Sequence, residues 1–317
     1  MPAIGASGAI VPTNIAGLYS GKGYKLIEAG VESPGHRSGR LDLAGVVGWR
    51  DATQVAYHGL GIDSPADTNT GFRMQQTFAR GEATGRPLPW LRVTAAASYE
   101  DYQIKDPTGD QTPVENAYSR QEAPEEAPGL GADPAYFHTT VSVSFDSRPN
   151  VDYARRGAMY RVAHHYYADR EQTYSFRRFD AEAVQHIPIL RENWVISLHG
   201  RLESTEGDED QVPFFLMPSL GSGSTLRAYS SWRFRDRQAA LASGEFRWIA
   251  NRLALDMALF VDAGVVAPRF DALSTRDMVG NYGIGVRFHG PARTPLRVEF
   301  AHGREGMHLV FAASAAF

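Results

Sequence analysis

The sequence contains no cysteine, and this absence removes disulfide frameworks, thiolate metal sites and cysteine nucleophiles. It also lacks any uninterrupted apolar run near the roughly 18 residues that a membrane-spanning helix requires. Neither sign of charge is in large excess, because 32 basic and 36 acidic residues give a net charge of −4. No basic surface therefore points to nucleic acid. These absences exclude a helical membrane protein, but they leave open a transmembrane β-barrel, whose alternating strands average out in hydropathy.

The first residues do not have the pattern of a signal peptide. Residues 1–14 carry no lysine or arginine, and Gly5, Gly8 and Pro12 interrupt their apolar residues. A protein of the outer membrane has to be exported. If the chain is such a protein, we expect this sequence to be a mature or truncated form.

Apolar and polar residues alternate along most of the chain, which is the pattern of β-strands with two different faces. The clearest case lies at the C-terminus, where one face carries Met307, Leu309, Phe311, Ala313, Ala315 and Phe317. The opposite face carries His308 and Ser314. About fourteen such strands are predicted, near 14–31, 38–50, 53–63, 70–82, 89–104, 136–148, 157–169, 174–190, 193–206, 237–250, 252–267, 278–289, 295–303 and 307–317.

The lengths of these strands and of their connections favour a membrane barrel. Many predicted strands are longer than the roughly 5–6 residues usual in soluble proteins and reach the roughly 9–11 that a tilted bilayer-spanning strand needs. Short turns are predicted at residues 51–52, 191–193, near Asn251 and at 290–294. Long loops rich in glycine, proline and acids are predicted at 105–135 and 207–236. Short turns on one side and long loops on the other are typical of outer-membrane barrels with a periplasmic C-terminus.

A soluble antiparallel sandwich or barrel is the alternative, since its strands also alternate. Two features argue against it. The faces opposite the apolar ones carry charged residues or histidine in nearly every strand, as a water-filled lumen would. Aromatic residues also lie near strand ends, as in an interfacial girdle; they are Trp49, Trp90, Trp194, Trp248, Phe288 and Phe317.

The stretch from Phe214 to Trp248, with the strand after it, contains the most specific motifs. A predicted loop tip is formed by Leu226, Arg227, Ala228 and Tyr229, and the following strand carries Phe260, Asp262 and Gly264. The tip resembles the Val/Leu-Arg-Gly-Phe/Tyr tip of the long sixth loop in the BamA/TamA outer-membrane assembly superfamily. The strand is similar to that family's Phe-x-Asp-x-Gly motif. Ala228 stands where the family usually has glycine, so the loop geometry would differ if this position requires a positive φ.

Three further features carry the same resemblance over residues 136–317. Five strands follow the loop, as in the family. Residues 146–150 and 155–157 look like a family periplasmic turn, and Phe317 resembles its C-terminal assembly signal. The family usually has sixteen strands and periplasmic POTRA modules. Here we predict an all-β antiparallel barrel of about fourteen strands, up to sixteen, with periplasmic termini, as a single domain over 1–317 without a POTRA module.

The loop and the strands after it predict a contact inside the barrel. By the parity of their strands, Glu245 and Asp262 point inward, so Arg227 on a loop folded back into the lumen could bridge to Asp262 with Glu245 nearby. A planar guanidinium can hold a carboxylate with two hydrogen bonds. The alternative is a solvated loop arginine.

No pattern in the sequence predicts catalysis, a cofactor or a metal site. His164 and His165 lie on opposite faces of one strand, so they cannot chelate one metal together. Residues 219–223 lack the strand-turn-helix setting of a nucleophile elbow. Residues 283–286 lie within a strand and have no helix N-terminus to hold phosphate. The acidic loops are better explained as a solvated surface than as cation sites.

The resemblance implies insertion or translocation of proteins at the bacterial outer membrane, by a chain that is not an enzyme. The implied partners are outer-membrane lipid, client outer-membrane or secreted proteins, and a periplasmic delivery partner or region. Two alternatives stay open. One is a passive pore or structural surface antigen, and the other is the membrane anchor of an enzymatic domain that this sequence does not include.

Overall fold

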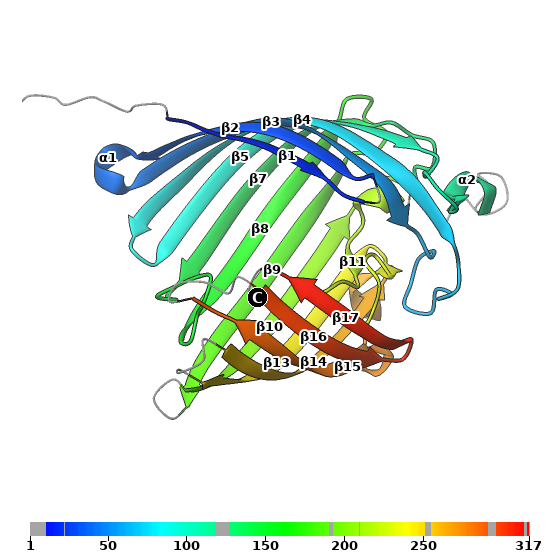
Figure 1. Ribbon diagram of the computed structural model, residues 1–317. Helices are drawn as coiled ribbons and strands as arrows, with labels where there is room; N and C mark the ends of the chain where they lie inside the picture. Colours follow the sequence, from blue (N-terminus) through cyan, green and yellow to red (C-terminus); the bar gives the residue numbers. More distant parts are fainter. Residues whose placement is uncertain are drawn as a thin grey trace, which may run out of the picture.

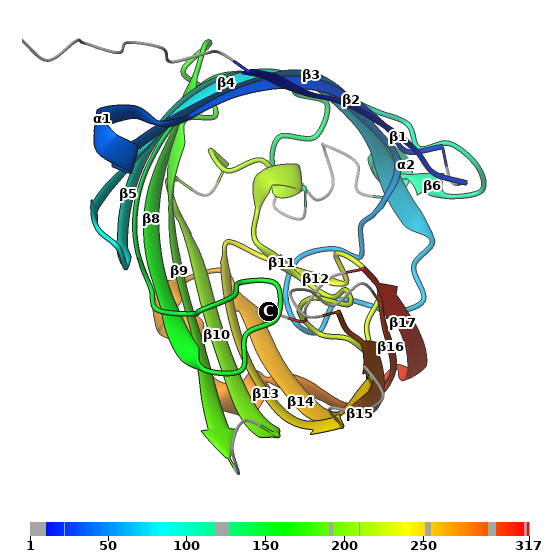
Figure 2. The same ribbon diagram turned by 60° about the vertical axis from the view of Figure 1, so that its left-hand side comes forward.

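The structure is a computed structural model and describes residues 11–21, 23–117, 127–189, 193–208, 210–250, 255–290, 296–313 and 316. Fourteen strands follow one another in one antiparallel sheet that curves around a lumen (Figures 1 and 2). They are β1 (Val11–Tyr19), β2 (Lys25–Gly35), β3 (Leu41–Ala56), β4 (Thr70–Leu88), β5 (Leu91–Lys105), β7 (Ala135–Asp146), β8 (Gly157–Asp169), β9 (Phe176–Ile189), β10 (Trp194–Glu206), β13 (Gln238–Ala250), β14 (Leu255–Ala267), β15 (Val279–Phe288), β16 (Leu296–Gly303) and β17 (Gly306–Ala312).

The remaining elements are short and lie in the connections. Two helical turns occur at α1 (His36–Gly39) and α2 (Val114–Ala117), and 3-10 turns occur at 214–216, 270–272 and 275–277. β6 (Thr112–Pro113) pairs in parallel with the start of β4. None of the helices in the described part of the chain is long and apolar enough to cross a membrane.

Burial alternates along the strands, so each strand has a lipid face and a lumen face. On β14, Leu259 and Val261 are exposed, while Phe260 and Asp262, which alternate with them, are buried. The same alternation on β17 exposes Met307. Large apolar side chains outside and charged ones inside are the pattern of an outer-membrane barrel.

The connections follow the predicted asymmetry. An even number of strands places the start of β1 and the end of β17 at the same end of the barrel. At that end the turns are mostly short, and at the other end lie the long connections 57–69, 106–134 and 207–237 (Figure 1). We call these the periplasmic and the external end.

The predicted strand number agrees with the structure, but two predicted boundaries were wrong. The strand expected at 14–31 is two strands, β1 and β2, because Ser20 and Tyr24 close a turn in which the Ser20 N–H donates to the Tyr24 carbonyl at 3.0 Å. Conversely, the strands expected at 38–50 and 53–63 begin as one strand, β3, which runs to Ala56. The two errors offset each other in the count.

The turn expected at Asp51 and Ala52 lies inside β3. Asp51 is fully buried and accepts two hydrogen bonds from Arg73 of β4, at 2.7 and 2.8 Å. Its carboxylate is therefore half of a lumen ion pair rather than a turn signal. The short periplasmic connection in this region is 36–40.

Many of the buried apolar residues form two clusters inside the barrel. One is near the external end and includes Tyr57, Phe72 and Phe214. The other surrounds the tip of the long loop and includes Leu226 and Phe260. Both clusters depend on the loop between β10 and β13, which makes this loop the center of the internal packing.

β1 and β17 lie at the two edges of the sheet. Among the described residues, β1 pairs only with β2 and β17 pairs only with β16. Figures 1 and 2 show these two edge strands apart from each other.

Candidate functional site

The connection between β10 and β13 folds back into the lumen (Figure 2). Within it, β11 (Ser219–Leu220) and β12 (Phe234–Arg235) form a small antiparallel hairpin. The tip lies between these two strands. Its four residues are at most 3% exposed; they are Leu226, Arg227, Ala228 and Tyr229.

The Arg227 guanidinium lies among the acids of the lumen wall. It donates from Nε to Asp262 Oδ2 and from Nη2 to Asp262 Oδ1, both at 2.9 Å, which is a bidentate contact. Nη1 donates to Glu245 and to Glu299, each at 3.2 Å. The guanidinium carbon also lies 3.6 Å from the centroid of the Phe260 ring, within range of a cation–π contact. The structure thus brings Arg227 to both acids named from the sequence and adds Glu299, which the sequence reasoning missed.

Two further arginines balance these carboxylates. Arg287 donates through both terminal nitrogens to Glu245 and at 3.1 Å to Glu299. Arg297 donates to Glu299 at 2.9 Å and to the carbonyl of Gly223 in the loop at 2.8 Å. Buried charges are tolerated when they are paired and hydrogen-bonded, so the network holds the loop through Arg227 and through Arg297.

Ala228 does not distort the loop tip. It is not among the described residues with a positive φ, so the altered geometry that the sequence left open does not arise. Its methyl group instead faces Gly303 of β16, where an added Cβ would lie only 3.0 Å from the Cβ of Ala228. A Cβ on Gly264 would likewise lie 2.7 Å from Leu220. The glycine of the strand motif therefore gives the loop space to pack.

Where the loop enters the barrel, aromatic packing fixes it. The Phe214 ring lies 4.8 Å from Tyr57 and 4.9 Å from Phe72 between centroids. Arg235 is buried beside it and donates to the Phe214 carbonyl at 2.7 Å. Burial lowers the pKa of Arg235 to about 10 and raises the pKa of Asp236 to about 6, because each charge has left water.

The periplasmic turn between β7 and β8 also enters the lumen. Tyr153 donates to Asp256 of β14, with oxygen distances of 2.8 and 3.0 Å, and stacks on His289 at 4.6 Å. Arg247 of β13 donates to the carbonyl of Ala154. This turn therefore reaches the C-terminal strands, a contact that the sequence did not predict.

Another polar cluster lies on the wall formed by β5, β7, β8 and β9. His138 lies 2.8 Å from Glu100 and 3.0 Å from His165, and His165 lies 3.2 Å from Asp180. His165 faces the lumen, while His164 is exposed on the outer face, as their parity predicted. The described residues contain no group of three or more histidine and acid side chains placed to hold a metal.

The predicted assembly signal at Phe317 lies outside the described residues, as does Ser314. Their roles stay predictions. Ala313 and Met307 on the same predicted face are exposed, as the alternation requires.

Comparison with known proteins places this geometry in a family. A model of the Omp85 superfamily domain matches residues 18–305. No curated protein matches the chain. Among solved structures, BamA from Haemophilus ducreyi lacking POTRA domains 1–3 is similar with a TM-score of 0.67 and 14% identity, over 91% of this chain and 61% of that one. CdiB from Acinetobacter baumannii is similar with a TM-score of 0.56 and 11% identity, over 91% of this chain and 49% of that one.

The chain therefore spans about 61% and 49% of the lengths of these two proteins, and at such identities the likeness establishes the fold. The family match covers most of the sequence. With its lipid-facing strands, its charged lumen and its inserted loop, the chain belongs to the Omp85 superfamily and is a β-barrel of the bacterial outer membrane.

Proposed function

We propose that this barrel inserts or translocates other proteins at the outer membrane. The observation that carries the proposal is that, in the part of the chain that the structure describes, β1 and β17 each have one unpaired edge at the two ends of one sheet. An unpaired edge strand presents free N–H and C=O groups, which another strand can satisfy by adding to the sheet. In a membrane such groups are costly, which favours pairing with a client strand.

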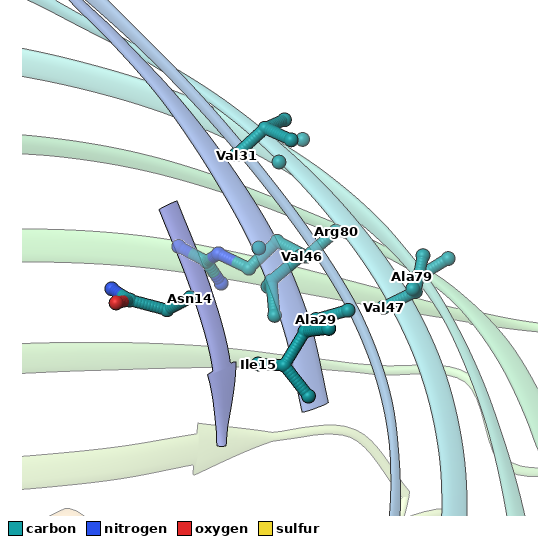
Figure 3. Close-up of a pocket in the computed structure, with 11 residues that line it drawn as sticks. Asn14, Ile15, Ala29, Val31, Val46, Val47, Ala79 and Arg80 are labelled. Carbon is teal, nitrogen blue, oxygen red and sulfur yellow. The ribbon is translucent and has the colours of Figure 1, made fainter. Parts of the chain in front are cut away.

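The outer face beside β1 is hollowed by small side chains (Figure 3). Ala29 of β2 and Ala79 of β4 lie close to Ile15 and Val47, and Gly45 adds no side chain. Ile15 on the edge strand is 89% exposed. Apolar side chains of an incoming strand could therefore lie in lipid next to this edge without meeting a bulky wall.

The contacts of Arg227 with Asp262, Glu245 and Glu299, which we call the lock, support this role in another way. Among the described residues, the side chains that accept from Arg227 lie on β13, β14 and β16, so the loop tip is fastened to the C-terminal strands and does not engage β1. We infer that client outer-membrane or secreted proteins are the partners. A periplasmic delivery partner or region would supply them. We propose no enzymatic activity for the chain.

Site-specific photo-cross-linking tests the proposal. A photoreactive amino acid is placed at Ile15 on β1 or Leu309 on β17, in barrel reconstituted into lipid vesicles, and an unfolded client barrel is added. Leu259 of β14 is the matched control, because it is exposed to lipid but its strand is paired on both sides.

Client adducts at Ile15 and Leu309, but not at Leu259, are the expected result. Equal adducts at all three positions would contradict it. A passive pore would instead give no adducts and a steady conductance in planar bilayers after deletion of 207–236.

A further inference from the structure

The connection 57–69 reaches across the barrel mouth. It joins β3 to β4, close to the β1 edge in the sheet order. Its middle part nevertheless lies against the hairpin of β16 and β17 at the opposite edge (Figure 1). The Gly61 N–H donates to the Arg235 carbonyl at 2.9 Å, and Arg304 donates to the Ile62 carbonyl at 3.4 Å. The connection therefore contacts both the long loop and the last hairpin.

Arg233 joins these three segments. It is 2% exposed and donates to the Ser64 hydroxyl at 2.9 Å and to the Ser64 carbonyl at 2.7 Å. Its Nε donates at 2.8 Å to Glu305 in the turn between β16 and β17. One guanidinium thus makes two hydrogen bonds to the connection between β3 and β4 and a third to the turn between β16 and β17. Five donors in a rigid plane suit arginine to this role, and lysine would not reproduce it.

The contacts of Arg233 with Ser64 and Glu305 lie at the external end of the barrel. Glu305 directly precedes β17, and β17 begins at the external end of its edge. Ser64 lies in an external connection. Among the described residues, no strand pairing joins the periplasmic part of β1 to that of β17.

We propose that Arg233 is a clamp across the external end of the gap between β1 and β17, so that the two edges separate chiefly at the periplasmic end. The inference rests on the proposed function only for its purpose, because a gap that widens toward the periplasm would admit clients from that side. The clamp itself is a property of the barrel alone. Arg233 is accordingly a positioning residue that acts through the segments it holds.

Distance measurements between spin labels test the clamp in the absence of any client. The chain has no cysteine, so two introduced cysteines are the only attachment sites. The external pair is Tyr19 and Met307, which are 74% and 71% exposed at the external ends of β1 and β17. The periplasmic pair is Ile15 and Phe311, 89% and 66% exposed and nearer the other end. The side-chain hydrogen bonds of Arg233 go to Ser64 and Glu305, so none of the four labelled side chains is one of these partners.

In the parent we expect a narrow distance distribution for the external pair and a broader one for the periplasmic pair. Arg233→Gln should shift the external distribution to longer and broader distances and leave the periplasmic one unchanged. Glu305→Gln, which removes the charge on one partner, should produce a smaller shift in the same direction. Arg269→Ala is the control, since Arg269 is an exposed arginine of another external loop that pairs with Asp271.

Each variant is first shown to be assembled by its faster migration unheated than boiled on a denaturing gel. An assembled Arg233→Gln barrel with an unchanged external pair, or with both pairs broadened equally, would overturn the clamp, whatever the cross-linking of clients shows. If the distances behave as expected but no client adduct forms at Ile15, the clamp stands and the proposed function fails.

Discussion

Removal of the Arg227 side chain should loosen the long loop from the lumen wall. Asp262 is 1% exposed in the parent, and among the described residues Arg227→Ala leaves Asn281, at 2.8 Å, as the remaining side chain that donates to it. Breaking a buried pair by removing one partner costs about 3–5 kcal/mol, because the other charge stays buried without compensation. The equilibrium for release of the loop should therefore rise by roughly 10²–10⁴-fold.

The structure predicts that the two single substitutions differ. Asp262→Ala leaves Arg227 with Glu245 and Glu299, each at 3.2 Å, and with the Phe260 ring. Arg227→Ala should consequently be the more damaging change. Arg227→Lys should recover only part of the loss, since an ammonium cannot fork onto Asp262.

A double-mutant cycle measures this coupling. Protease cleavage and amide exchange of residues 207–237 are followed for the parent, both single variants and the double variant in detergent or vesicles. The double variant should be little worse than Arg227→Ala, because it contains no stranded carboxylate at 262. If the two effects add within about 0.5 kcal/mol, Arg227 and Asp262 do not act as a unit, and the lock is refuted.

Four further predictions concern other parts of the barrel. The protein should be extracted only with detergent and migrate faster unheated than boiled; a detergent-free soluble monomer would contradict the membrane assignment. Because burial raises the pKa of Asp236 to about 6, this carboxyl group contributes to the stability of the fold below about pH 4. The contribution is lost as the pH rises through about 6 and the group ionises. Asp236→Asn should therefore protect the loop from protease relative to the parent at pH 8 but not at pH 4; equal pH profiles would refute this. Tyr153→Phe should cost about 1–3 kcal/mol, because it removes the hydroxyl that donates to Asp256 and leaves His289 Nε2, at 3.3 Å, beside that carboxylate. Faster amide exchange in 147–156 is expected, whereas unchanged exchange would argue against the contact. Replacing Phe317 with a charged residue should reduce the amount assembled in the membrane more than the same replacement at Ser314, and equal losses would count against the signal.

Most of the strand framework could be predicted because alternation is a local property. β8 was predicted at 157–169 and observed at Gly157–Asp169, since its alternating run is long. Asp51 shows where this reasoning fails. An acid beside alanine resembles a turn, and only the register of β3 against β4 reveals Arg73 as its partner.

In the candidate site, too, local patterns could be predicted and contacts set by strand register could not. Parity along single strands placed Glu245 and Asp262 on the lumen side, and the motif pointed to Arg227. Glu299 also has inward parity on its strand, but nothing in the sequence says how far along the barrel axis it lies. Its contact with Arg227 depends on the registers of β13 through β16, each set by a different turn. The contact between Arg233 and Ser64 could not be predicted, because no local pattern relates the connection between β3 and β4 to the loop between β10 and β13.

The lock also has a consequence for the order in which the barrel forms. The partners of Arg227 lie 18, 35 and 72 positions after it in the chain, whereas Ser64 lies 169 positions before Arg233. Closing a longer stretch of chain costs more entropy and is slower, so contacts of small separation should form first. The last hundred or so residues thus hold every group needed to seat the loop tip against its wall. The C-terminal strands and the loop would form an early nucleus, and the first strands would wrap around it last, when the clamp closes.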